Sequence, residues 1–112
     1  MDGFIYNGKG YTAKNCYFEK NSYAENRNLR LDIFGDCGLG GAEPVVTVTL
    51  NIGKTFPENV VALNCYLEED DNLLKEMVKL GLVSKVLGVS KVGRVTVPVC
   101  ELNPSMIELY SY

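Results

Sequence analysis

The chain has 112 residues, of which 46% are hydrophobic and 22% are charged, and its formal net charge is −3. This composition supplies enough apolar surface for one core and excludes a disordered chain, so we expect a single domain over residues 1–112. The absence of histidine excludes Ser-His-Asp and Cys-His catalytic arrangements and every histidine-containing metal site. No stretch approaches the roughly 20 apolar residues of a membrane helix, and the first ten residues lack a basic region followed by an apolar run. We therefore expect a cytoplasmic protein without membrane contact.

The first predicted element is an aromatic hairpin within residues 1–25, at the periphery of the domain or within its main sheet. Asn7-Gly8 is a turn signal between two short aromatic segments. Stacking rings beside cations can bind single-stranded nucleic acid, although tyrosines are also ordinary strand residues and the pI of 4.9 argues against a nucleic-acid footprint. A surface for a partner protein or for nucleic acid would contain the residues Tyr6, Tyr11, Tyr17, Tyr23, Lys9 and Lys14.

Alternating apolar residues predict half-buried strands over residues 29–33, 46–52, 60–67 and 95–99. Between the first two lies the segment GDCGLGGAEP, which predicts a hairpin connection or an ordered loop. A glycine-rich loop can also hold phosphate through backbone N–H groups, but this one matches neither G-x-G-x-x-G nor the P-loop, and a strand follows it. The phosphate interpretation would make the protein one that sequesters a nucleotide or another small molecule.

One main helix is predicted after Asp71, and it would bury its apolar positions Leu73, Leu74, Met77, Val78 and Leu80. Gly81 would end it in a left-handed conformation, and Leu82 would make the accompanying apolar contact.

An acidic run precedes the predicted helix and consists of Glu68, Glu69, Asp70 and Asp71. It belongs to an acidic block, residues 31–72, in which eight acidic residues face Lys54 alone. Carboxylates at this place suit the positive end of the helix dipole, and a surface for a basic partner is the alternative. The spacing does not fit a calcium loop, so we expect neither a metal nor a cofactor.

The rest of the chain offers little for catalysis. The repeated segments VSKVLG and VSKVG would place Lys85 and Lys91 on one face if the strand is continuous, or on a hairpin if Gly88 breaks it. Asn103-Pro104 predicts a short helical turn. Four cysteines without a C-x-x-C pair are expected to be reduced and mostly buried: Cys16, Cys37, Cys65 and Cys100. Cys37, Ser84 and Ser90 lack a base at a recognisable spacing, so we predict that the protein is not an enzyme.

These elements together predict an α+β fold. We expect a mostly antiparallel β-sheet of about five to seven strands with one main α-helix packed on a face. Exposed strand edges also make a homo-oligomer compatible with the sequence.

The chain resembles an uncharacterised family over roughly residues 29–102. The segments that carry the resemblance are EPVVTVTLNI, PENVVALNCYLEEDDNLLKEMVKLGLV and RVTVPVCEL, with the best agreement at Leu50-Asn51, in the predicted helix and at Val97–Cys100. The aromatic N-terminus and VSKVLGVSKVG lie outside the shared pattern. The family comprises short proteins from phages and integrative mobile elements of Gram-positive bacteria, and it has no assigned reaction or active residues.

The resemblance implies a genomic setting rather than a chemistry. Proteins of such elements often act by binding a host protein, for example by inhibiting a defence nuclease as anti-CRISPR proteins do. We therefore expect a non-enzymatic accessory protein that works through protein–protein interaction with a host partner. The alternatives are sequestration of a nucleotide or small molecule, and single-stranded nucleic-acid contact through the N-terminus.

Overall fold

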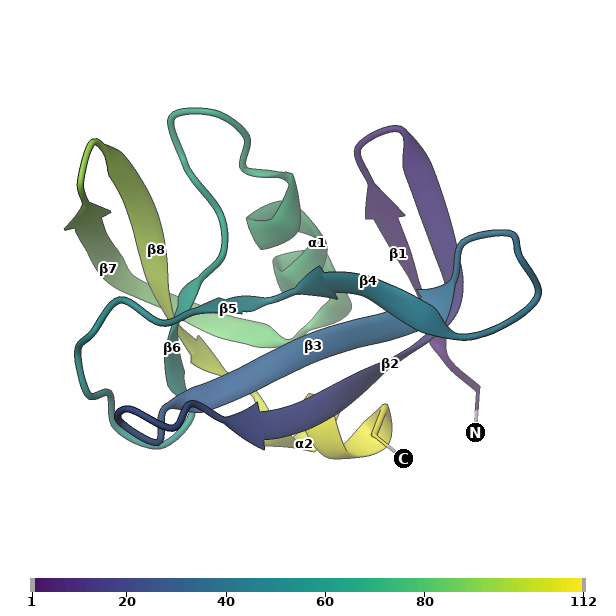
Figure 1. The fold of residues 1–112 in the computed structure, drawn as a ribbon, viewed down its shortest axis with the longest axis horizontal. Helices are drawn as coiled ribbons and strands as arrows, with labels where there is room; N and C mark the ends of the chain where they lie inside the picture. The colour runs from purple at the N-terminus through teal and green to yellow at the C-terminus, as the bar shows by residue number, and fades with distance from the viewer. Residues whose placement is uncertain (1, 112) are drawn as a thin grey trace.

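The computed structural model describes residues 2–111 and shows two β-sheets and two helices around one core (Figure 1). Each sheet has four antiparallel strands, in the orders β1-β2-β3-β4 and β5-β6-β8-β7. The elements are β1 (Phe4–Gly8), β2 (Tyr11–Ser22), β3 (Leu29–Asp36), β4 (Glu43–Thr47), β5 (Thr49–Leu50), β6 (Val60–Leu63), α1 (Asn72–Leu80), β7 (Val83–Val92), β8 (Val95–Leu102) and α2 (Pro104–Leu109). The mostly antiparallel α+β character is confirmed, but the described residues form eight strands in two sheets rather than five to seven in one, and a second short helix is present.

The predicted strand over residues 46–52 is divided between the two sheets. β4 pairs with β3, whereas β5 pairs with β6, and the chain crosses at Val48, which is fully buried. The backbone N–H of Val48 donates to the Leu31 oxygen at 2.8 Å, and its oxygen accepts from the Asn64 N–H at 2.8 Å. The crossing backbone is therefore hydrogen-bonded in the core.

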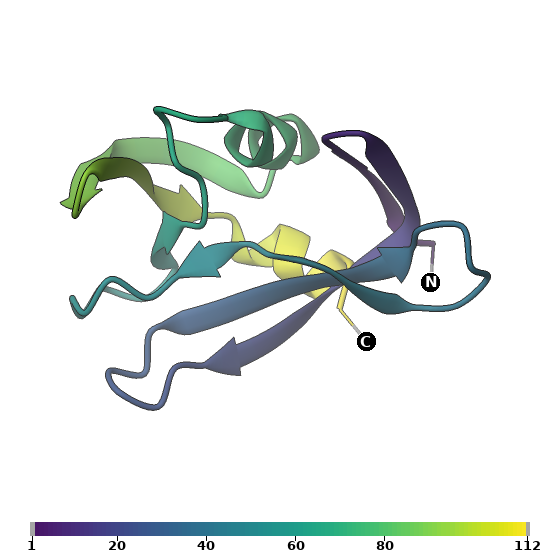
Figure 2. The ribbon, with the colours of Figure 1, turned by 45° about the horizontal axis from the view of Figure 1, so that its top comes forward.

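The N-terminal hairpin contributes to the core through buried residues of β1 and β2, among them Phe4, Ala13 and Phe18. Its turn lies at Lys9–Gly10, where Gly10 has a φ of 80°, so the turn predicted at Asn7-Gly8 was placed too early. β2 bends at a bulge around Asn15, whose φ is 52°. The bend brings the hairpin up to α1 (Figure 2). The Asn72 side chain donates to the Asn7 oxygen there.

Helix α1 ends as the sequence predicts. Gly81 has a φ of 89°, its N–H donates to the Val78 oxygen, and the Leu82 N–H donates to the Met77 oxygen at 3.0 Å. Leu73 and Met77 are buried, but the prediction that Val78 is buried was wrong, because α1 spans the edge strands β1 and β7 and leaves this flank in solvent. The predicted strand over residues 60–67 ends at Leu63, and a turn segment over residues 64–71 leads into the helix.

Helix α2 begins at the predicted cap. The Asn103 side chain accepts from the Ser105 N–H at 3.0 Å, and Pro104 occupies the first turn. The chain then returns to the first sheet, where the Phe18 N–H donates to the Tyr110 oxygen at 2.8 Å. The ring of Phe4 lies 4.9 Å from that of Phe18 and 5.0 Å from that of Tyr110, so an aromatic cluster fixes α2 beside β2.

Strand β7 is continuous but contains two bulges. The second lies between Val86 and Gly88, so Lys85 pairs with Glu101 whereas Lys91 pairs with Thr96. These partners are an odd number of residues apart on β8, and the two lysines therefore lie on opposite faces, against the prediction. No helix within residues 2–111 has the length and apolar character needed to span a membrane.

Candidate functional site

The acidic run is tied into the protein by its own hydrogen bonds. Glu68 accepts from the Thr96 N–H at 2.6 Å and from the Thr96 hydroxyl at 2.5 Å, and it lies 3.8 Å from the Lys91 amine. These two bonds to Thr96 hold the pKa of Glu68 below its usual value. Glu68 therefore joins the turn segment before α1 to the β7–β8 hairpin.

The other acidic residues of the run have different surroundings. Asp70 accepts from the Asn72 N–H at 2.9 Å and lies 3.5 Å from the Lys9 amine. Asp71 makes no side-chain bond to the helix backbone but lies 3.3 Å from the Lys75 amine, one turn along α1. Glu69 is exposed. Three of the four carboxylates thus have a lysine within 4 Å, and the run is not a concentrated negative patch.

The Glu68 contact predicts a specific acid sensitivity. The folded pKa is below the ordinary value of 4.5, so the contact stabilises the protein above that pH and is lost as the pH falls through the lowered folded pKa. Asp36, whose pKa is also lowered, contributes in the same window. We expect Glu68→Gln to reduce the fall in thermal midpoint on acidification, measured by circular dichroism. Glu69→Gln is the control, and an equal reduction by both variants would contradict the assignment.

Of the four predicted tyrosines, Tyr11 alone is exposed, at 41%. Tyr6 is buried. Its burial is the main cause, and the adjacent Tyr11 the second, that raises the pKa of Tyr6 to about 12. Tyr17 stacks on Phe34 with ring centroids 5.8 Å apart. The hydroxyl of Tyr23 lies 3.2 Å from the Thr49 oxygen, to which it donates. Since base stacking needs an open ring face, these surroundings favour the packing role of the tyrosines.

The structure brings together part of the aromatic and part of the acidic candidates. Tyr6, Tyr11 and Lys9 face Glu69 and Asp70 across a cleft of about 280 Å³ between the β1–β2 hairpin and the turn segment. Lys9 and Asp70 form an ion pair within this cleft, so the lysine and one of the two carboxylates that line it are already paired. The remaining candidates lie elsewhere: Lys14 is exposed on β2 opposite Asp36, and Tyr17, Tyr23, Glu68 and Asp71 do not line the cleft.

The glycine-rich loop connects β3 to β4, as the hairpin interpretation predicts. Its backbone donors are used within the loop, because the carboxylate of Asp36 accepts from the N–H of Gly38 at 2.8 Å and from that of Gly40 at 3.0 Å. These bonds lower the pKa of Asp36. The loop therefore binds its own carboxylate at the place where a phosphate would sit, which disfavours the nucleotide alternative.

The four cysteines are free thiols, and Cys37 is the exposed one. Local desolvation and the nearby Glu43 carboxylate raise the pKa of Cys37, which is opposite to the change that activates a nucleophile. We expect a thiol reagent to modify Cys37 alone in the folded protein and all four cysteines after unfolding, as counted by mass spectrometry. Cys37→Ser should remove the native reaction, and rapid labelling of Cys100, whose pKa burial raises to about 11, would contradict this account. Within residues 2–111, no three potential metal-ligating side chains are grouped to hold an ion.

A concave surface lies beside the edge of β2 that faces away from β3, and Tyr17 is the one predicted site residue that lines it. β1 covers β2 only as far as Cys16, and Phe18 bonds to Tyr110 beyond it. Because the Phe18 N–H points away from β3, the alternation of an antiparallel ladder directs the backbone groups of Lys20 and Ser22 the same way. Leu31, which pairs with Lys20, shows the same orientation. Its backbone oxygen accepts from Val48 and its N–H donates to the Thr49 hydroxyl, so both groups point to the side of β3 away from β2.

Two adjoining cavities follow this edge, and we call them together the β2 groove. The larger, of about 610 Å³, lies between β2 and α2, and the smaller, of about 270 Å³, lies between β2 and the loop before β6. Lys20, Glu58 and Asn59 line both. The groove thus combines strand backbone that has no partner among residues 2–111 with walls from α2 and the loop.

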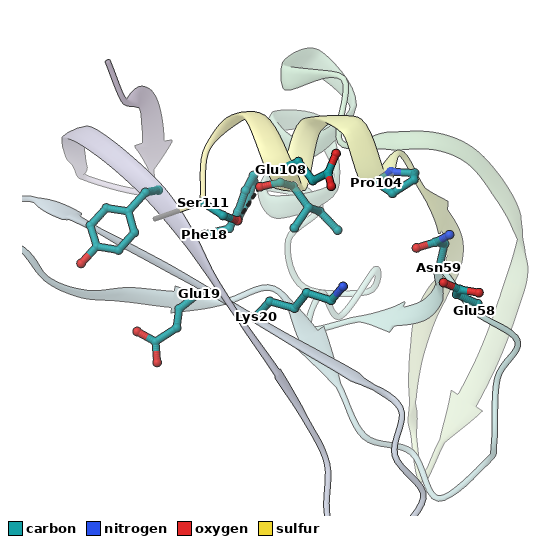
Figure 3. A pocket seen from close by; sticks show the side chains of 10 residues that line it. Phe18, Glu19, Lys20, Glu58, Asn59, Pro104, Glu108 and Ser111 are labelled. Carbon is teal, nitrogen blue, oxygen red and sulfur yellow. Dashed lines mark hydrogen bonds between the residues drawn. The ribbon is translucent and has the colours of Figure 1, made fainter. Parts of the chain in front are cut away.

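The charges in the groove are few and opposed. Figure 3 shows the Lys20 side chain reaching into the space between α2, which carries Glu108, and the loop, which carries Glu58 and Asn59. Glu19 points away from this space, as the strand alternation requires. Lys20 makes no ion pair with another of the described residues 2–111. Glu58 and Glu108 therefore lie beside Lys20 in the larger cavity, and Arg27 lines the smaller cavity.

A weak sequence signal for this site was present in the last residues of β2. Glu19-Lys20-Asn21-Ser22 is a polar ending to an otherwise aromatic strand, which is typical of an unpaired edge. Comparison with protein-family models, with curated proteins and with solved structures found no match.

Proposed function

We propose that this protein acts by binding another protein, through addition of an extended polypeptide segment to β2 within the β2 groove. The observation that supports the proposal is the edge of β2 at Lys20 and Ser22, where two backbone N–H and two C=O groups point away from β3 and bond to no other residue between 2 and 111. Phe18, Pro104 and Ile107 supply apolar lining for its side chains. At the neighbouring position along this edge, the Phe18 N–H already donates to the Tyr110 oxygen. The incoming segment would extend this pairing to Lys20 and Ser22.

The charge of the larger cavity favours basic side chains in the segment. Glu58 and Glu108 line this cavity with Lys20, whereas Arg27 lines the smaller cavity. Lysine or arginine side chains of the incoming segment would meet these carboxylates, while the Lys20 amine would bind a main-chain oxygen or an acidic side chain. In the larger cavity beside α2, basic side chains fit this arrangement better than acidic ones.

The resemblance to short proteins of phages and mobile elements suggests the kind of partner. Under this proposal the partner is a host protein, for example a defence nuclease, and binding inhibits it without any reaction by this chain. Nuclease surfaces that hold nucleic acid are basic, which agrees with the charge of the groove. The open edge also permits a homo-oligomer, which the binding experiment distinguishes.

The experiment uses two end-capped peptides, one of alternating lysine and valine and one of alternating glutamate and valine. We expect the basic peptide to bind, with shifts at the Lys20 and Ser22 amides in NMR spectra. Lys20→Pro, which removes an edge donor, and the pair Glu58→Gln with Glu108→Gln should each weaken binding by about tenfold or more.

Lys20→Ala, which keeps the backbone donor, separates the strand contribution from that of the side chain. Equal binding by wild type and Lys20→Pro would contradict strand addition. Dimerisation through the same amides without added peptide would assign the groove to a second copy instead. If the peptide result holds, wild type and Lys20→Pro become matched baits for the host protein.

A further inference from the structure

A second surface lies on the edge strand of the other sheet. Six consecutive residues of β7, from Ser84 to Val89, are exposed, and three of them are large and apolar: Val86 at 46%, Leu87 at 47% and Val89 at 61%. Val78, 49% exposed, lies on α1, which packs against β7. We call Val78, Val86, Leu87 and Val89 the β7 patch. Exposed apolar groups gathered on adjoining elements mark an interaction surface.

The pairing of β7 explains why these side chains are grouped. Val86 pairs with Cys100 and Val89 pairs with Pro98, and these partners are two residues apart on β8. The bulge between Val86 and Gly88 therefore places both valines on one face, although their spacing in the sequence is odd. A regular strand would have separated them.

The backbone of this edge is also open. The Thr96 oxygen accepts from the Leu67 N–H, so the Lys91–Thr96 pair does not exchange bonds within the hairpin. The backbone groups of Lys91, and by alternation those of Val89, then point away from β8. An extended chain can bond there while its apolar side chains contact the β7 patch.

The hairpin that carries the β7 patch has positive groups on both faces. Lys91 shares the face of Val86 and Val89, Lys85 lies on the opposite face beside Glu101, and Arg94 is in the turn. An extended segment beside β7 directs alternate side chains to the two faces, so carboxylates that alternate with apolar residues would lie on the face of Lys85. The hairpin already binds one carboxylate, that of Glu68, through Thr96 and close to Lys91. An antiparallel pair of β7 strands from two copies would concentrate the like charges of both hairpins.

From these features we propose that the β7 patch binds an extended acidic segment of another protein, with apolar residues alternating with carboxylates. This inference goes beyond the β2 groove, because it concerns a different sheet and the opposite charge. Together the two surfaces would give the protein two strand-addition sites of different specificity.

The test uses the same two peptides with the full chain. The alternating glutamate and valine peptide should bind with shifts at the Val89 and Lys91 amides, and its affinity should fall as salt is raised. The double variant Val86→Thr with Val89→Thr, which keeps β-branched side chains, should weaken this binding by about tenfold or more while the basic peptide binds as before. Lys20→Pro is the matched control, because it should leave the acidic peptide unaffected.

Several outcomes would overturn the inference. The first is unchanged affinity of the threonine variant for the acidic peptide. The second is a larger shift of the Val89 and Lys91 amide signals with the basic peptide than with the acidic one. The third is concentration-dependent dimerisation, measured by sedimentation, that the threonine variant abolishes. The last result would assign the β7 patch to a second copy. None of them bears on the β2 groove, whose amides and variants are separate.

Discussion

Replacing Asn21 by proline is expected to lower the free energy of unfolding by about 3 kcal/mol or more, whereas Lys20→Pro should change it by less than about 1 kcal/mol. Asn21 pairs with Arg30, and its N–H points toward β3, so a proline there removes a ladder bond and places a ring against the neighbouring strand. The N–H of Lys20 points into the β2 groove, where no ladder bond is lost. Urea unfolding of both variants measures the difference.

The comparison is sharp because the two positions are adjacent, polar and exposed. Strand propensity and side-chain burial would predict similar losses for both, and only the direction of the N–H separates them. If Lys20→Pro were as damaging as Asn21→Pro, the edge of β2 would be paired and the proposed binding site would not exist.

Phe18→Ala is expected to cost about 3–5 kcal/mol, a large part of the stability of a small domain. Phe18 is 1% exposed, and its ring packs on Phe4, which in turn contacts Tyr110. Its loss leaves a cavity under the groove and loosens the attachment of α2 to β2. Thermal and urea unfolding measure the loss, and hydrogen exchange should show faster exchange in α2.

Phe34→Ala provides the matched control for this prediction. Phe34 lies on β3, is half-buried and stacks on Tyr17 rather than filling the core. Its removal should cost less than the removal of Phe18, because less surface returns to water and less cavity is left. Equal losses would show that the Phe4–Phe18–Tyr110 cluster is not the main attachment of α2.

Local patterns in the sequence predicted the local parts of the fold. The helix with its Gly81 ending, the Asn103-Pro104 cap and the β3–β4 hairpin depend on neighbouring residues, and the structure confirms them. The crossing at Val48 could not be predicted, because residues 46–52 have one alternating pattern but their pairing partners belong to two sheets.

The candidate sites show the same limit. The acidic run was visible, but its bonds to Thr96 and Lys9 come from elements distant in sequence, and they convert a suspected patch into structural contacts. The β2 groove combines Lys20 with Glu58 and Glu108, which only tertiary contacts bring together. The bulge in β7 likewise reversed the predicted placement of Lys85 and Lys91.

Amide hydrogen exchange at Lys20 and Ser22 tests the central claim most directly. In the free protein we expect these two amides to exchange rapidly, while those of Phe18 and Asn21, which bond to Tyr110 and along the β2–β3 ladder, are protected. Addition of the alternating lysine and valine peptide should then protect Lys20 and Ser22. Protection of both amides before any peptide is added, or rapid exchange at saturating peptide, would contradict strand addition at β2.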